Sequence, residues 1–259
     1  MIQAGFEEKS NWTNPAITYV FSDLIEEYDM HDAGLSICKY YGLLSGDKIE
    51  KLTHMSKEQK VVVLGKMQKK SDFRDALSKG FSDIRKEFYE ANHLEEEDII
   101  AVKKDAIFTR KDCEVRIFGD PHAPNLKTVE FVVKHQYSSY VKIPGTNLEL
   151  YYNGAIDVKG IDDSSIPLHE NGILEILKMY FRKAETGTVD DVLSYMNRVV
   201  STYKLRKYPL EYYREFNSDS LYTDKDGEKY KEYWEDEISD LDISYNFLKI
   251  LVPLTKIVA

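Results

Sequence analysis

The sequence has few cysteines and no long hydrophobic run, and each absence excludes a class of protein. Its 259 residues include only two cysteines, Cys38 and Cys113, which are too few for a disulfide framework or a zinc-binding set. No apolar stretch approaches the ~20 residues that a membrane-spanning helix needs. The acidic beginning of the sequence lacks the pattern of a secretory signal peptide. We therefore expect a cytoplasmic protein with no membrane partner.

The signatures of several enzyme classes are also missing. The sequence contains no G-x-S-x-G, P-loop or G-x-G-x-x-G motif, and its six histidines show no metal-binding spacing. Cys38 lies in an apolar helical pattern that is typical of a core position. Cys113 has no obvious base close to it in sequence. Nucleophilic hydrolases, common nucleotide-binding folds and histidine-based metal sites therefore receive little support.

Acids outnumber basic residues overall, but one region carries a net positive charge. The net charge of -10 argues against a protein that binds nucleic acid by electrostatics alone. Residues 57–86 nevertheless contain nine basic and four acidic residues, a net +5, whereas residues 219–242 contain ten acids and three lysines, a net -7. A basic middle between acidic ends is compatible with a nucleic-acid groove. A solvated helix surface explains it equally well.

Hydrophobic spacing and turn residues predict an α+β fold with helices, then a sheet, then helices. We expect helices over residues 14–28, with Asn14 as N-cap, and over 32–44, 56–70 and 71–94. Closely spaced β-rich runs then predict an antiparallel meander, because they leave no room for helical crossovers. The expected strands span residues 99–102, 106–110, 114–118, 128–135, 138–143, 148–152 and 155–158. Helices are expected again over 168–185, 188–208 and 241–259. The chain thus divides into a region 1–160, with N-terminal helices and the sheet, and a helical region 161–259.

Two acidic residues occupy positions that are typical of magnesium ligands. Asp105 lies at the turn of a predicted hairpin, in "DIIAVKKDAIFT", and Asp29 ends an extended segment before a helix, in "YDMHDAGLSI". Oxygen ligands suit Mg²⁺, and one or two protein carboxylates are usually enough, because phosphates and water complete its coordination. The basic block 57–86 lies between these two acids in the chain.

These segments resemble the palm domain of template-directed nucleic-acid polymerases. "YDMHDAGLSI" looks like motif A of families A and B, and "IIAVKKDAIF" looks like motif C, so the resemblance covers about the first 110 residues. It implies a nucleotidyltransferase in which Asp29 and Asp105 hold Mg²⁺ and act in catalysis on nucleic acid and nucleotides. It also implies that Lys60 or Lys66 contacts a triphosphate.

The chain departs from the palm pattern in two respects. Many palms carry paired acids or a His-Asp pair in motif C, whereas Lys103 and Lys104 precede a single Asp105 here. These lysines would weaken Mg²⁺ binding, or would hold a phosphate instead. The chain is also short for a polymerase with full fingers, thumb and exonuclease modules. A palm-like remnant that works with other subunits, or without catalysis, is therefore an open alternative.

Each of these residues also has a plain structural interpretation. Asp105 can be a solvated hairpin tip, because "KKDA" is an ordinary turn sequence. Asp29 or Asp32 can serve as the N-cap of the following helix. Most of the basic residues between 57 and 86 can simply keep the surface soluble.

Two other function classes remain open. Asp157 and Lys159, at a strand end, resemble the acid-x-lysine pair of metal-dependent nucleases, with Asp120 or Glu130 as the further acid. The plainer interpretation is a strand whose polar residues face water. The acidic, tyrosine-rich C-terminal third instead suggests a non-catalytic module that binds a protein partner.

The tyrosines allow a further hypothesis about nucleic acid. Nineteen tyrosines are present, and exposed rings can stack on bases, whereas buried ones pack across strands. The tyrosines considered for stacking are Tyr137, Tyr140, Tyr151, Tyr152, Tyr212 and Tyr213.

Overall fold

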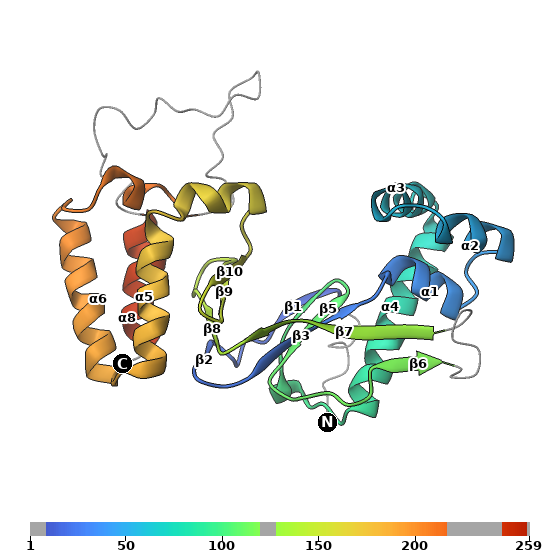
Figure 1. Ribbon diagram of the computed structural model, residues 1–259, viewed down its shortest axis with the longest axis horizontal. Coiled ribbons are helices and arrows are strands. Elements are labelled where there is room, and N and C mark those ends of the chain that lie inside the picture. The colour runs from blue at the N-terminus through green and yellow to red at the C-terminus, as the bar shows by residue number, and fades with distance from the viewer. Residues whose placement is uncertain (1–8, 120–127, 217–244, 258–259) are drawn as a thin grey trace, which may run out of the picture. The chain divides into compact units, whose positions relative to one another are not determined.

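The computed structural model describes residues 9–119, 128–216 and 245–257 (Figure 1). The chain forms two compact units. The first contains Met1–Ala16 and Leu24–Gln136, and the second contains Ile17–Asp23 and Tyr137–Ala259. The main division thus falls at residue 137 rather than at the expected residue 160, because the last three strands belong to the same unit as the C-terminal helices.

The first unit is a six-stranded sheet with helices inserted between its strands (Figure 1). The sheet order is β1-β4-β5-β3-β7-β6. The elements are β1 (Asn11–Thr13), β3 (Ile25–Met30), α1 (Ala33–Tyr40), α2 (Gly46–Thr53), α3 (Lys57–Met67), α4 (Ser71–Ala91), β4 (Ile99–Lys103), β5 (Ala106–Thr109), β6 (Ile117–Gly119) and β7 (Thr128–Tyr137). Strand β3 therefore lies between β5 and β7, although the chain reaches it long before either of them.

The helix expected over residues 14–28 does not form, and this prediction was wrong. The segment contains β2 (Tyr19–Val20) and most of β3 instead. Asn14 caps no helix: its amide nitrogen donates to the carbonyl oxygens of Glu96 at 2.8 Å and Ile99 at 3.0 Å. The pairing of β3 inside the sheet overrides the helical spacing of its apolar residues, as tertiary context commonly does.

The basic region forms two helices, as expected. Helix α3 begins with a capping box, in which the Ser56 hydroxyl accepts from the Gln59 N–H and the Gln59 side chain accepts from the Ser56 N–H. Helix α4 buries Leu77, Ile84 and Phe88 in one apolar cluster with residues of β3, β4, β5 and β7. The long helix therefore forms the core of this unit together with one face of the sheet.

The second unit combines a smaller sheet with the C-terminal helices (Figure 1). Its four strands have the order β10-β9-β8-β2. The elements are β8 (Ser139–Lys142), β9 (Glu149–Tyr152), β10 (Ile156–Lys159), η2 (Asp163–His169), α5 (Ile173–Thr186), α6 (Val189–Lys204), η3 (Leu210–Tyr213), a π-helical turn η5 (Phe247–Leu251) and α8 (Val252–Ile257). The helices and one face of the sheet share a single apolar core.

The α+β class is therefore confirmed, whereas the single meander is not. The hairpin β4–β5 and the run β8–β9–β10 are antiparallel, as predicted. The strands are nevertheless divided between two sheets, and β3 joins the first of them. In the described part of the chain, no helix is both long and apolar enough to cross a membrane.

Candidate functional site

The structure brings Asp29 and Asp105 to the same end of neighbouring strands. Strands β3 and β5 are antiparallel, and Asp29 is aligned with Ala106, the residue after Asp105. The Met30 N–H also donates to the carbonyl oxygen of Asp105 at 3.2 Å. Burial raises the pKa of Asp105, and the negative charge of Asp29 raises it further. The two carboxyl groups are therefore close enough to influence each other's charge.

A lysine and a second acid complete this cluster. Lys134, on β7, places its Nζ 3.3 Å from Oδ2 of Asp29 and 3.6 Å from Oε1 of Glu27. Glu27 and Asp29 are alternate residues of β3, so their side chains share one face of the sheet. Burial opposes the charge on Lys134, but Asp29 and Glu27 outweigh it and raise the pKa of the ammonium group.

Sequence reasoning missed both Glu27 and Lys134. The alternating acids of "EEYDM" were a usable signal for a strand with one acidic face. The helical spacing of residues 14–28 hides that signal, because it places Glu26, Glu27 and Tyr28 in a helix. Lys134 had no comparable signal, because only the pairing of β3 with β7 places it beside Asp29.

Asp29 and Asp105 supply the number of carboxylates that a magnesium site commonly uses. Among the described residues, no group of three or more His, Cys, Asp or Glu side chains has the arrangement needed to hold a metal ion. Mg²⁺ commonly needs only one or two protein carboxylates, with water and phosphate oxygens as its other ligands. Asp29 and Asp105 together fit this smaller requirement.

The turn that carries Asp105 is held by a buried arginine. The guanidinium group of Arg85, on α4, donates to the carbonyl oxygen of Lys104 at 3.1 Å, and Arg85 is only 1% exposed. Lys104 has a left-handed backbone (φ 57°) and an exposed side chain. Lys103 donates from Nζ to Oγ1 of Thr13 at 3.0 Å. Sequence reasoning treated Arg85 only as one member of the basic block, whereas the structure makes it a support of the hairpin.

The two lysines expected to contact a triphosphate differ in their surroundings. Lys60 forms an ion pair with Asp32, with Nζ 2.6 Å from Oδ2. Asp32 follows closely after the end of β3, so this pair lies near the Asp29 end of that strand. Lys66 is exposed near the end of α3. Asp29 lies inside β3 and Asp32 makes no capping hydrogen bond, so neither acid is a side-chain cap of α1.

The acid and the lysine of the second candidate site pair with each other. Asp157 pairs with Lys159 of the same strand at 2.9 Å and accepts from the Tyr137 hydroxyl at 2.5 Å. Glu149 of β9, which is aligned with Lys159 of β10, forms an ion pair with Lys142 at 3.6 Å. Glu130 lies in the first unit, and Asp120 lies outside the described residues.

Most of the tyrosines proposed for base stacking are buried. Tyr137, Tyr140, Tyr151, Tyr152 and Tyr213 are all in the interior. Tyr212 is half-buried and stacks on Tyr208, with ring centroids 4.7 Å apart. These rings therefore pack within the protein instead of offering an exposed stacking surface. The C-terminal third was expected to bind a protein partner, and its most acidic part, residues 219–242, lies outside the described residues.

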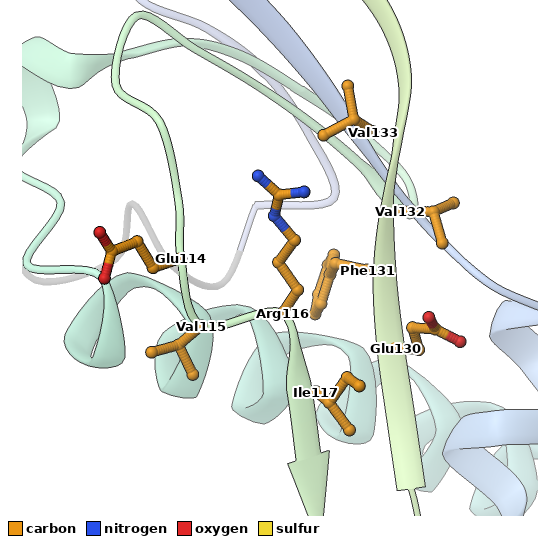
Figure 2. Close-up of a pocket in the computed structure, with 8 residues that line it drawn as sticks. All are labelled: Glu114, Val115, Arg116, Ile117, Glu130, Phe131, Val132 and Val133. Atoms are coloured by element: carbon orange, nitrogen blue, oxygen red, sulfur yellow. The ribbon is translucent and has the colours of Figure 1, made fainter.

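A hollow in the first unit is lined by Glu130, one of the acids predicted for the nuclease, but by neither Asp29 nor Asp105 (Figure 2). It is formed by residues 114–117 and 130–133 of β6, β7 and the loop before β6. Arg116, which lies beside Phe131 in Figure 2, is already engaged. It donates to the carbonyl oxygen of Cys113 at 2.6 Å and to Asp112 at 3.0 Å, and its guanidinium carbon lies 5.3 Å from the Tyr28 ring centroid.

Comparison with known proteins places the whole chain in one family. The family described as Bacteriophage PBS1 gene 130 protein matches residues 2–258. Because this match covers nearly all of the sequence, the chain belongs to that family. No curated protein matches the chain.

Proposed function

We propose that this member of a bacteriophage protein family is a Mg²⁺-dependent nucleotidyltransferase of the palm type, which acts on nucleic acid. The observation that carries the proposal is the meeting of Asp29, near the end of β3, with Asp105, at the turn of the β4–β5 hairpin. The sequence alone suggested both acids as ligands but could not bring them together.

The order of the elements supports the same interpretation. Helices α1 to α4 separate β3 from the hairpin in sequence, yet β3 pairs directly with the second hairpin strand. A strand carrying one acid beside a hairpin carrying the other is the arrangement implied by the resemblance to palm motifs A and C. The basic helices α3 and α4 lie between them in the chain, as the resemblance also implies.

The surrounding charges suit a phosphate-containing substrate. When bound, Mg²⁺ would neutralise developing charge on a transferring phosphoryl group. Asp29 and Asp105 would hold that ion through their carboxylate oxygens. Lys60, held by Asp32, together with Lys66, Lys103 and Lys104, would supply positive charge for phosphates. Since carboxylate ligands must be ionised and the pKa of Asp105 is raised, metal affinity should increase with pH.

Divalent-metal binding and primer extension test the proposal together. Mn²⁺ binding, followed by electron paramagnetic resonance, should weaken at least tenfold in Asp29→Asn and in Asp105→Asn, because each change removes one of two charged ligands. Primer extension with Mg²⁺ or Mn²⁺ should be lost in both variants. Asp98→Asn is a matched control, because Asp98 is an acid of the same unit that pairs with Lys111 away from this site.

The outcomes separate the open alternatives. Metal binding that depends on both acids, without any primer extension, would indicate an accessory palm that works with other subunits. Mn²⁺ binding unchanged by either substitution would refute the metal site. Metal-dependent cleavage of nucleic acid that is lost in Asp157→Asn would instead favour the nuclease. The protein-binding module has no supporting observation among the described residues.

A further inference from the structure

We propose that Lys134 is a displaceable counter-ion, which bridges Asp29 and Glu27 when no divalent cation is bound and is retained by Glu27 when Asp29 binds one. This inference rests on the proposed function, because it assumes that Asp29 is a metal ligand. It assigns distinct tasks to two residues that the palm resemblance did not identify.

The geometry gives Lys134 two anchors that are not equivalent. Its Nζ is 3.3 Å from Asp29 and 3.6 Å from Glu27. Glu27 is 2% exposed and lies further from the end of β3. The Asp29 side chain is 26% exposed and lies next to the Asp105 turn. Asp29, the outer anchor, is therefore accessible to a cation from solvent, whereas Glu27, the inner anchor, is enclosed.

The charges also favour an exchange at Asp29. Glu27, Asp29 and Asp105 carry three negative charges when ionised, and Lys134 balances one of them. A divalent cation would balance the remaining two, provided that Lys134 stays within reach. Glu27 provides the place for it to stay, so the ammonium group need not return to water when Asp29 turns to the metal.

The lysine side chain is suited to this movement. The Lys134 side chain is 48% exposed, and a lysine carries a compact charge on a flexible four-carbon stem. A rotation of that stem would carry Nζ from its position between the two carboxylates toward Glu27 alone. Arginine, with its planar and more rigid group, would hold both carboxylates at once.

Two substitutions should change metal affinity in opposite directions. In Lys134→Met, Asp29 has no competing ammonium, so the protein should bind Mn²⁺ about fivefold or more tightly than the wild type. In Glu27→Gln, Lys134 loses its inner anchor and stays on Asp29, so Mn²⁺ binding should weaken by a similar factor. Lys111→Met is the control for net charge, because Lys111 pairs with Asp98 and does not contact Asp29.

A double variant separates this exchange from simple electrostatics. If Glu27 acts by retaining Lys134, then Glu27→Gln should have little effect on Mn²⁺ binding in the Lys134→Met background. If Glu27 acts only through its own negative charge, the two effects should be additive. Nitrogen NMR of the lysine side chains gives a readout without turnover: the Lys134 signal of the wild type should shift on Mg²⁺ addition, and that of Lys111 should not.

The results distinguish failure of this inference from failure of the proposed function. Equal or weaker Mn²⁺ binding by Lys134→Met, with binding still lost in Asp29→Asn, would overturn the exchange and leave the metal site standing. Unchanged Mn²⁺ binding in Asp29→Asn and Asp105→Asn would overturn both the exchange and the proposed metal site. Lys134→Gln, which keeps a polar side chain, is the second variant if Lys134→Met fails to fold.

Discussion

Acidification should destabilise the second unit through His169. This histidine is 0% exposed at the end of η2, and neither ring nitrogen has a hydrogen-bond partner in the part of the chain that the structure describes. Its ring packs edge-on against Phe216, with centroids 4.9 Å apart. Burial, with a smaller contribution from the positive charge of Arg214, lowers the pKa of His169 from 6.5 to about 4.

The direction of the effect follows from proton binding. Between pH 6.5 and about pH 4, the unfolded chain binds a proton on His169 that the folded chain does not bind, so a falling pH favours unfolding. The contribution is fully present above pH 6.5 and is lost as the pH falls toward 4. At ~1.36 kcal/mol per pH unit, the total loss is roughly 3 kcal/mol.

Urea unfolding at a series of pH values measures this contribution. Wild type and His169→Gln should differ in how steeply the free energy of unfolding falls between pH 6.5 and 4.5, and the variant should be the flatter of the two. Carboxylate titration contributes to both proteins, so the difference between them isolates His169. His54→Gln, at an exposed position, is the control and should follow the wild type. Identical slopes for wild type and His169→Gln would refute the reasoning.

Two further predictions concern the stability of the first unit. A Cβ at Gly80 would lie 2.6 Å from Ile37 of α1, so Gly80→Ala should destabilise by about 1–3 kcal/mol in urea unfolding. Gly65→Ala, where a Cβ meets nothing within 4 Å, should stabilise α3 by about 0.5–1 kcal/mol. If both glycine substitutions changed the free energy of unfolding in the same direction, this explanation would be contradicted. Arg85→Met should destabilise by about 1–3 kcal/mol, since it removes the donor to the partly buried Lys104 carbonyl. The exposed neighbour Lys86 serves as control, and Lys86→Met should change stability by less than ~0.5 kcal/mol. A similar loss of stability in Arg85→Met and Lys86→Met would argue against the importance of the Arg85 contact.

The sequence alone determined those elements whose signals are local. The Ser56 and Gln59 pair predicts the beginning of α3, because both halves of a capping box lie within one helical turn. The apolar spacing of α4 and the "KKDA" turn of the β4–β5 hairpin also act over a few residues, and the structure confirms both elements. Asp105 could therefore be located at a turn without any knowledge of the rest of the fold.

Only the tertiary structure decided what lies beside that turn. The helical spacing of residues 14–28 gave a wrong local answer, because the pairing of β3 between β5 and β7 stabilises a strand there. That pairing joins Asp29 to the Asp105 turn and brings Lys134 to Asp29 and Glu27. Strand neighbours so far apart in the chain leave no periodic trace in the sequence. The acids of the candidate site were thus visible in the sequence, whereas their meeting and their lysine were set by long-range sheet pairing.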